Sequence, residues 1–256
     1  NFTGQPSKTV AGEKIKTESG SFIEVEGLDK YGNLNTGFSS SVTLSTNESS
    51  DLQTVSASTG KASFDNAKIS EAASYNLEAS SSGVDMDTSN VFDVVPGDAE
   101  SLSIVKHPSN GVAGAQFAST VVVNDSEGNP VNNVSVDAVI NESSFVSGTT
   151  SVKTNSSGEA SFDDLVIEDS GNYSLNFSLD GNDSNVASSV SKGSNGFEVA
   201  AAAANKIVFT RNSSSVVAGN RSEFTVELRD LYSNPTINHS GFDDVIEAAE
   251  GVLEPE

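Results

Sequence analysis

The run Asp125-Ser126-Glu127-Gly128-Asn129-Pro130-Val131 separates two stretches in which apolar residues alternate with polar ones. The first stretch covers residues 117–123 and the second covers 134–140. Apolar residues at every second position are typical of a β-strand with one buried face, and Gly-Asn-Pro is turn chemistry. An aspartate that opens such a turn accepts hydrogen bonds from nearby backbone N–H groups. The sequence therefore predicts two strands joined by a hairpin corner at this point.

The same turn occurs twice more, as Asp29-Lys30-Tyr31-Gly32-Asn33 and as Asp230-Leu231-Tyr232-Ser233-Asn234. A Val-Ala-Gly tripeptide precedes each turn, starting at residues 10, 112 and 217, so the copies are 102 and 105 residues apart. Such a period indicates tandem domains. We expect one domain in residues 1–98, with its first strand clipped, a second in 99–204 and a partial third in 205–256. The third is expected to continue beyond this sequence or to be completed by a strand from a neighbouring chain.

The alternating runs also indicate the fold class. Each full copy contains about seven of them and no amphipathic helix of respectable length, which predicts an all-β chain of tandem Ig-like antiparallel β-sandwiches with Greek-key connections. Tyr75 and Tyr173 each begin a late strand, two residues before Leu77 and Leu175. That position is typical of a tyrosine corner, in which the ring packs in the core and the hydroxyl bonds the backbone. The residues assigned a structural role are Tyr75, Tyr173, Asn33, Gly128 and Asn129.

The charge balance excludes several kinds of partner. Thirty-six acidic residues against 13 basic ones give a net charge of −23. That sign is opposite to the one that nucleic acid or an anionic lipid surface requires. No run of 18 apolar residues occurs, so we expect no membrane insertion in this segment. An acidic surface suits a saline medium, where counterions screen self-repulsion within about 8 Å.

Catalytic and redox chemistry have little support in the sequence. The chain has no cysteine, so it has neither a disulfide framework nor a thiol site. His107 and His239 lie in different copies without the spacing of zinc ligands. No nucleophile elbow and no phosphate-cradling glycine loop occurs. We expect no enzyme and no required cofactor.

Clustered carboxylates near the junctions between copies are weak candidates for calcium, which takes six to eight oxygen ligands. The candidates are Asp85, Asp87, Asp98, Glu100, Asp180 and Asp183. None of them belongs to an EF-hand loop, and solvated loop charge is the favoured alternative. A melting temperature that does not change on chelation would contradict structural calcium.

Asn-x-Ser/Thr sequons form the densest local signal. Twelve of the 24 asparagines stand in one, whereas the abundance of serine and threonine would give about 6 by chance. The sequon asparagines are Asn1, Asn47, Asn124, Asn133, Asn141, Asn155, Asn172, Asn176, Asn182, Asn212, Asn220 and Asn238. Two interpretations stay open: N-glycosylation of exposed strands, or a serine-rich composition that carries no glycan.

Four motifs in a shared order carry a resemblance to a known family. They are Gln5-Pro6-Ser7-x-x-Val10-Ala11-Gly12, Asp125-x-x-Gly128-Asn129-Pro130-Val131, Gly158-x-Ala160-x-Phe162 and Gly171-x-Tyr173-x-Leu175. With these blocks, residues 1 to about 235 resemble bacterial and archaeal Ig-like surface repeats of the invasin/intimin kind (bacterial Ig-like group 1). The departures are Ser233 in place of glycine and extra residues ahead of the first turn. Such repeats form adhesin stalks, fibres and surface-layer segments.

The resemblance and the repeat together give a functional expectation. We expect a non-enzymatic structural module of a prokaryotic extracellular surface-layer, sheath or filament protein, which assembles through contacts between Ig-like domains. The expected partners are other copies of the chain, together with glycans or ligands on a host or cell surface. The alternative is a stalk or ligand-binding module of a cell-surface adhesin, for which Tyr31 and Tyr232 are the candidate exposed aromatics.

Overall fold

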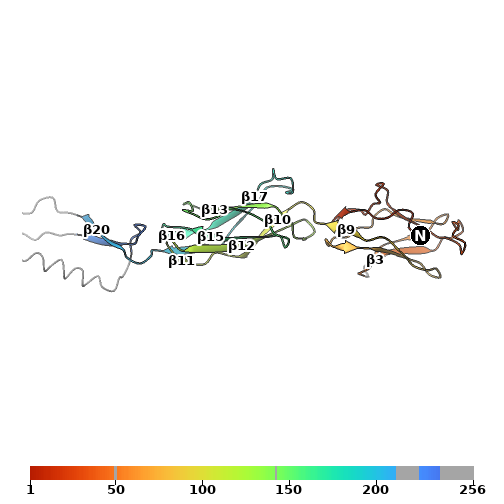
Figure 1. Cartoon of the computed structure of the whole chain (residues 1–256), viewed down its shortest axis with the longest axis horizontal. Helices are drawn as coiled ribbons and strands as arrows, with labels where there is room; N and C mark the ends of the chain where they lie inside the picture. The colour runs from red at the N-terminus through yellow and green to blue at the C-terminus, as the bar shows by residue number, and fades with distance from the viewer. Residues whose placement is uncertain (49–50, 142, 212–224, 237–256) are drawn as a thin grey trace, which may run out of the picture.

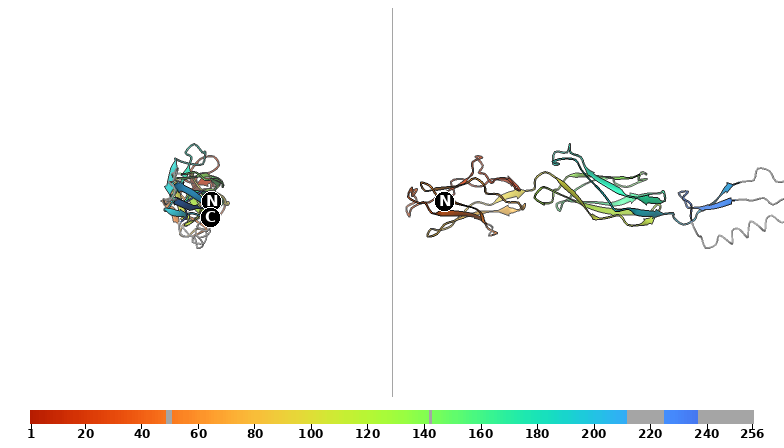
Figure 2. Two further views of the ribbon diagram at one scale, coloured as in Figure 1. Left: turned by 90° about the vertical axis from the view of Figure 1, so that its left-hand side faces the viewer. Right: turned by 180° about the vertical axis from the view of Figure 1, so that it is seen from behind.

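The computed structural model describes residues 1–48, 51–141, 143–211 and 225–236, and this part of the chain is all-β, without a helix. Two β-sandwiches and a short strand pair follow one another along the long axis (Figure 1). The same order is visible from behind, and the view along the axis shows a narrow cross-section (Figure 2). No helix long and apolar enough to cross a bilayer occurs among the described residues.

The first module consists of strands β1 to β9. Their bounds are β1 Thr9–Val10, β2 Ile23–Glu26, β3 Ser41–Thr46, β4 Asp51–Ser56, β5 Lys61–Phe64, β6 Ser74–Tyr75, β7 Leu77–Ser80, β8 Asp87–Thr88 and β9 Phe92–Val95. One sheet has the order β4-β3-β7-β8. The sheet β1-β9-β6 belongs to the same layer, because β6 and β9 continue the ladder of β7 and β8, and the pair β2-β5 forms the opposite layer.

The second module repeats this arrangement with strands β10 to β19. Their bounds are β10 Ser101–Lys106, β11 Gly111–Val112, β12 Gln116–Asn124, β13 Ser135–Ile140, β14 Ser151–Lys153, β15 Glu159–Val166, β16 Gly171–Tyr173, β17 Leu175–Leu179, β18 Val190–Gly193 and β19 Phe197–Ala200. One layer contains β14-β13-β17-β18 together with β11-β19-β16, because β16 and β19 continue the ladder of β17 and β18 across a bulge, and β10-β12-β15 forms the other layer.

Alternation in the sequence produces the core of each sandwich. Along β12 every second side chain is buried, among them those of Phe117, Val121 and Val123. Phe162 and Phe177 come from opposite sheets and meet at the centre of the second module, with ring centroids 5.2 Å apart. Full burial of such a side chain contributes about 1.5–3 kcal/mol. The two modules have separate cores, so each buries its own apolar face.

The ten strands of the second module lie on seven extended segments, because three segments carry two strands each. These segments are β10/β11, β16/β17 and β18/β19. β10 pairs antiparallel with β12, and β11 then pairs parallel with β19 in the other sheet. The prediction of about seven strands per Ig-like sandwich is therefore confirmed at the level of segments.

The prediction that the turn 125–129 is a hairpin corner between two paired strands is wrong, although the turn itself closes locally as a hairpin does. β12 pairs with β10 and β15, whereas β13 pairs with β14 and β17 in the opposite sheet. The hairpin pairing is confined to the turn itself, with a bridge between Asn124 and Pro130 and a hydrogen bond from the Val131 N–H to the Val123 carbonyl at 3.0 Å. Beyond Pro130 the chain crosses to the other sheet, so the turn lies at one end of the sandwich instead of closing a strand pair. Alternation cannot tell these arrangements apart, because both give one buried face per strand.

The late tyrosines close the other end of each sandwich. The rings of Tyr75 and Tyr173 are buried. Tyr75 Oη donates a hydrogen bond to the Glu71 carbonyl at 3.2 Å, and Tyr173 Oη donates one to the Asp169 carbonyl at 3.1 Å. Each bond holds the loop that leads into the tyrosine strand in a fixed shape. We call these two loops, 70–72 and 168–170, the corners.

The third segment is described as one antiparallel pair and one turn. β20 Lys206–Arg211 pairs with β21 Thr225–Arg229, and the turn 230–234 follows. Phe209 pairs with Val226 as Phe2 pairs with Val25 in the first module, so the two chain regions share one register. The part of the predicted third domain from residue 237 onward lies outside the described residues. The predicted domain boundaries stay predictions.

Candidate functional site: the joints between modules

The three five-residue turns at 29–33, 125–129 and 230–234 have one geometry, and we call them the Asp–Asn turns. In the second of them, Asp125 Oδ1 accepts hydrogen bonds from the backbone N–H of Glu127 at 3.0 Å and of Asn129 at 2.8 Å. The Asn129 side-chain amide donates to Asp125 Oδ2 at 3.0 Å. Gly128 has φ +92°, a left-handed conformation that glycine adopts without strain. The carboxylate thus fixes the shape of the turn from within.

The first joint forms where this turn meets the first module. The Asn129 side chain uses both ends of its amide: Nδ2 donates to the Ser70 carbonyl at 2.7 Å, and Oδ1 accepts from the Ala72 N–H at 2.8 Å. Both partners belong to the corner of the first module. Asn129 is only 7% exposed. One side chain of the second module therefore bonds two backbone groups of the first.

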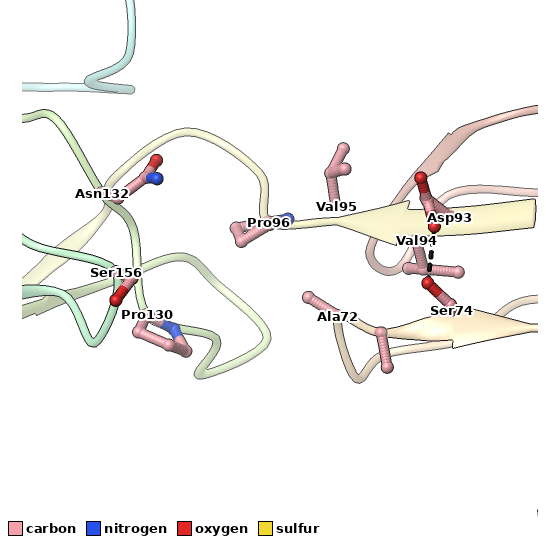
Figure 3. A pocket seen from close by; sticks show the side chains of 10 residues that line it. Ala72, Ser74, Asp93, Val94, Val95, Pro96, Pro130, Asn132 and Ser156 are labelled. Atoms are coloured by element: carbon pink, nitrogen blue, oxygen red, sulfur yellow. Dashed lines mark hydrogen bonds between the residues drawn. The ribbon is translucent and has the colours of Figure 1, made fainter.

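The linker between the two modules is held by the same turn. Asp125 Oδ2 accepts a hydrogen bond from the Gly97 N–H at 2.9 Å. A groove beside this contact is lined by residues of both modules, among them Ala72, Pro96 and Pro130 (Figure 3). The linker is thereby attached to the turn that docks on the corner, so the joint has no free hinge at Gly97.

The second joint repeats these contacts atom for atom. Asn234 Nδ2 donates to the Glu168 carbonyl at 2.7 Å, and Asn234 Oδ1 accepts from the Ser170 N–H at 2.8 Å. Asp230 Oδ2 accepts from the Ala202 N–H in the linker at 2.9 Å. Asp230 is fully buried. Two joints of the same chemistry in one chain indicate a repeated device for setting the orientation between modules.

The third residue of each of the two joint turns, Glu127 or Tyr232, lies over the Val-Ala-Gly loop of the preceding module. A Cβ atom built on Gly12 would lie 2.7 Å from the Glu127 carboxylate, and one built on Gly114 would overlap the phenol of Tyr232. Tyr232 is half-buried and packs against the core of the second module. Both glycines have positive φ, +77° and +79°. Each joint turn therefore contacts the Val-Ala-Gly loop and the corner of the preceding module, as well as the linker.

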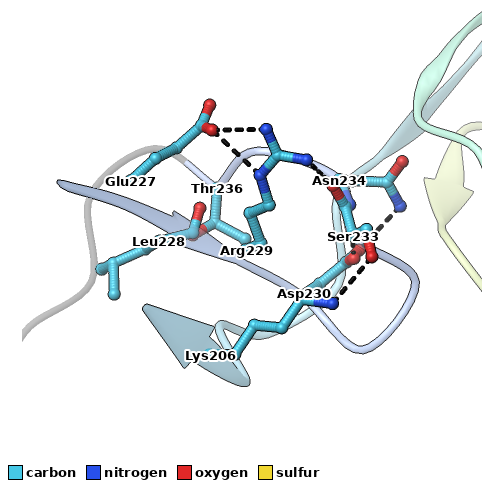
Figure 4. A network of polar contacts seen from close by, with 8 residues as sticks. All are labelled: Lys206, Glu227, Leu228, Arg229, Asp230, Ser233, Asn234 and Thr236. Atoms are coloured by element: carbon cyan, nitrogen blue, oxygen red, sulfur yellow. Dashed lines mark hydrogen bonds and ion pairs between the residues drawn. The ribbon is translucent and has the colours of Figure 1, made fainter. Parts of the chain in front are cut away.

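The third turn keeps the geometry with serine in the glycine position. Ser233 has φ +78°, which costs a residue with a Cβ atom about 1–2 kcal/mol. Two cations contact it: Lys206 Nζ donates to Ser233 Oγ at 2.7 Å, and Arg229 Nη1 donates to its carbonyl at 3.2 Å. Arg229 is itself held by Glu227 at 2.7 Å (Figure 4). These contacts are absent from the glycine-containing turns and offset part of the strain.

The carboxylates of both joints are stabilised in their charged form. Burial raises the pKa of Asp125, but the hydrogen bonds from Asn129, Gly97 and Glu127 outweigh burial and lower that pKa below its ordinary value. The pKa of Asp230 is lowered in the same way, against burial, by hydrogen bonds from Asn234, Ala202 and Tyr232. A depressed pKa in the folded state means that these groups stabilise the joints above the ordinary carboxyl pKa of about 4.

We therefore expect the joints to loosen in acid before the sandwiches unfold. Since the pKa values of both aspartates are lowered, the stabilisation is complete above about pH 4 and is lost as the pH falls through the lowered values. Small-angle scattering of the intact chain from pH 7 to pH 2 would show a stiff rod becoming a bent ensemble, while circular dichroism still reports folded sandwiches. An unchanged scattering profile with folded sandwiches at pH 2 would contradict this expectation.

The structure does not gather the calcium candidates into a site. No group of three or more acidic or histidine side chains suited to a metal occurs in the described part of the chain. Asp180 Oδ1 accepts hydrogen bonds from the Asn182 backbone and side chain, and Asp183 accepts one from the Asn185 N–H. Asp87 accepts one from the Phe2 N–H. These contacts are loop chemistry, and a calcium site stays a prediction.

The sequon asparagines in the described part of the chain lie on the surface. The exposed ones are Asn1, Asn47, Asn133, Asn141, Asn155, Asn172, Asn176 and Asn182, and Asn124 is half-buried. Asn212, Asn220 and Asn238 lie outside the described residues. The surface position leaves glycosylation sterically open at these sites.

The sequence did not predict that the joint residues contact another module, although it did predict the turns that carry them. Asn129, Asp125 and Asp230 were explained by turn chemistry alone, and Ser70 and Ala72 contribute only backbone atoms, which leave no trace in a sequence. One signal was present. The first and fifth positions of all three turns are Asp and Asn, while the second, third and fourth vary, which favours a task beyond closing a turn.

Comparisons with known proteins agree with the fold. No family model matches the sequence, and no curated protein matches it. Among solved structures, the chain is similar to FdeC, an adhesin of Escherichia coli (16% identity, TM-score 0.48, covering 92% of this chain and 74% of that one). Invasin, a bacterial integrin-binding protein, matches at 15% identity and TM-score 0.40, covering 94% of this chain and 48% of that one. Domains 4 and 5 of the S-layer protein SbsC match at 13% identity and TM-score 0.31, covering 77% of this chain and 94% of that one. These are likenesses of fold alone.

Proposed function

We propose that this chain is a non-enzymatic structural segment of a prokaryotic extracellular surface-layer, sheath or filament protein. The observation that supports the proposal most is the repetition of the joint. Asn129 bonds the corner of the first module, and Asn234 bonds the corner of the second through the same atoms. A repeated fixed joint converts a row of small sandwiches into a stiff rod, which is the property that a surface assembly needs from its building blocks.

The mechanism is mechanical and rests on hydrogen bonds that flexible linkers lack. A neutral hydrogen bond contributes about 0.5–1.5 kcal/mol and one to a charged group about 1.5–3 kcal/mol. Each joint combines two neutral bonds from the asparagine with one charge-assisted bond from the linker to the aspartate. Bending the rod at a joint breaks all three bonds together, so the straight arrangement is favoured.

The strongly acidic surface supports an extracellular place for the rod. A net charge of −23 keeps rods apart in dilute solution and is screened in saline water. Other copies of the same chain are the partners that fit a lattice or filament best. Glycans on the exposed sequon asparagines would cover the outer strands and limit lateral sticking. Native protein with an intact mass above 26.4 kDa per copy of this segment would support the glycans, and an unmodified mass would contradict them.

A stalk of a cell-surface adhesin remains the second candidate, since the same joints would stiffen a stalk that carries a binding tip. The two assignments differ in how the native object is arranged. Electron cryo-microscopy of the native cell surface would show a regular lattice or fibre if the chain is an assembly module. Isolated stalks that project singly from the surface would contradict the assembly assignment and favour the adhesin.

A further inference from the structure

The Asp–Asn turn of the first module has the geometry of the two joint turns. Asp29 Oδ1 accepts hydrogen bonds from the Tyr31 N–H at 2.8 Å and the Asn33 N–H at 3.0 Å, and Asn33 Nδ2 donates to Asp29 Oδ2 at 3.3 Å. Gly32 has φ +85°, close to the values of Gly128 and Ser233. The turn is therefore already in the shape that docks elsewhere in the chain.

This turn differs from the joint turns in its exposure. Asn129 and Asn234 are each 7% exposed, whereas Asp29 and Asn33 are exposed. Asn33 Oδ1 accepts no hydrogen bond from any described residue, although the corresponding atoms of Asn129 and Asn234 each accept one. The joint-facing atoms of the first turn are thus available.

An exposed aromatic residue distinguishes this turn from ordinary turn chemistry. Tyr31 is 77% exposed, with the Lys30 ammonium 4.8 Å from the centre of its ring. Tyr232 occupies the same place in the third turn and is packed on the glycine of a Val-Ala-Gly loop. Turn chemistry accounts for the aspartate, glycine and asparagine, but it gives no reason for a tyrosine at this position. A partner surface like the loop on which Tyr232 packs would explain a tyrosine here.

We propose that the turn 29–33 is a third, open copy of the joint, and that it docks on a module of the same kind. The partner must present a Val-Ala-Gly loop, over which Tyr31 packs, beside a tyrosine corner. It must also offer a backbone carbonyl and, two residues later, an N–H group to the Asn33 amide. The first and second modules both present this surface, so the partner is an Ig-like module whose linker enters ahead of Phe2. The inference rests on joint geometry and is independent of where the protein works.

The test adds such a module to the intact chain in the observed register. Residues 99–207 are fused directly before residue 1, so that Asn1 and Phe2 take the places of Val208 and Phe209. We expect nitration of Tyr31 by tetranitromethane to slow about tenfold relative to the unfused chain, reaching the reactivity of Tyr232. The Ser170 amide of the added module should gain protection from hydrogen exchange.

The matched control is the same fusion with Asn33→Ala, which removes both hydrogen bonds to the corner. Protection of the added Ser170 amide should fall about tenfold. In the unfused chain Asn33→Ala removes only the exposed bond to Asp29, so the melting temperature of the first module should change little. A second fusion, with residues 1–102 before residue 1, supplies the first module as partner in case the other added copy does not fold. Folded added modules that leave Tyr31 as reactive as in the unfused chain would overturn the inference. That outcome would leave the proposed function intact, because the two observed joints would still stand.

Discussion

Replacing Asp125 with alanine is expected to open the first joint while both sandwiches stay folded. The carboxylate is 3% exposed and accepts hydrogen bonds from the turn and from the Gly97 N–H in the linker. Removing it leaves buried donors without an acceptor and frees the Asn129 side chain that bonds the corner. Hydrogen bonds to a charged group contribute about 1.5–3 kcal/mol each and do not add fully, so we expect the joint to lose about 3 kcal/mol.

A loss of that size is large enough to measure at single amides. About 3 kcal/mol corresponds to roughly a hundredfold change in an equilibrium constant. Hydrogen exchange of the Ala72 and Gly97 amides should accelerate by about that factor in Asp125→Ala, and small-angle scattering should report a bent chain. Amides in the core strands of both modules should keep their protection.

Asp29→Ala is the matched control for this experiment. It removes the same hydrogen bonds within a turn, to the Tyr31 and Asn33 N–H groups, but Asp29 is exposed and contacts no linker among the described residues. The difference between the two variants therefore isolates the joint from the turn. Equal exchange of the Ala72 amide in both variants would show that Asp125 does not hold the joint.

The sandwiches could be predicted from the sequence because alternation reports which face of a strand is buried. Val121 and Val123 in β12, and Leu175 and Phe177 in β17, follow that rule without exception. Tyr75 and Tyr173 could also be placed, since their position two residues before a buried leucine is diagnostic. Burial inside one module places apolar residues at every second position of a strand, and the tandem repeat shows this pattern in both modules.

The joints could not be predicted because their partners are backbone atoms. The carbonyl of Ser70 and the N–H of Ala72 would be there with almost any side chains, so these positions carry no pattern. Alternation also could not show that β12 and β13 belong to different sheets. That error placed the turn 125–129 within a strand pair instead of at the end of the module, where it contacts its neighbour. The interpretation of this turn as a corner that contacts no other module followed from the same error.

Gly114→Ala is expected to open the second joint, and Gly12→Ala is its matched control. Both glycines have positive φ, so each substitution costs its own module about 1–2 kcal/mol in backbone strain. The difference lies in what the new methyl group meets. On Gly12 it meets the flexible end of Glu127, which can turn away. On Gly114 it overlaps the ring of Tyr232, a rigid group packed against the core.

The two variants should therefore destabilise their own modules equally but differ at the joints. In Gly114→Ala the Ser170 N–H, which donates a hydrogen bond to Asn234 Oδ1, should lose about tenfold or more in protection from exchange. Tyr232 should also become reactive to tetranitromethane. In Gly12→Ala the corresponding Ala72 amide should change little. Adding Tyr232→Ala to Gly114→Ala removes the overlap and should restore part of the Ser170 protection. If the double variant exchanges as fast as Gly114→Ala alone, the opening comes from backbone strain in the loop, and the tyrosine contact does not set the joint.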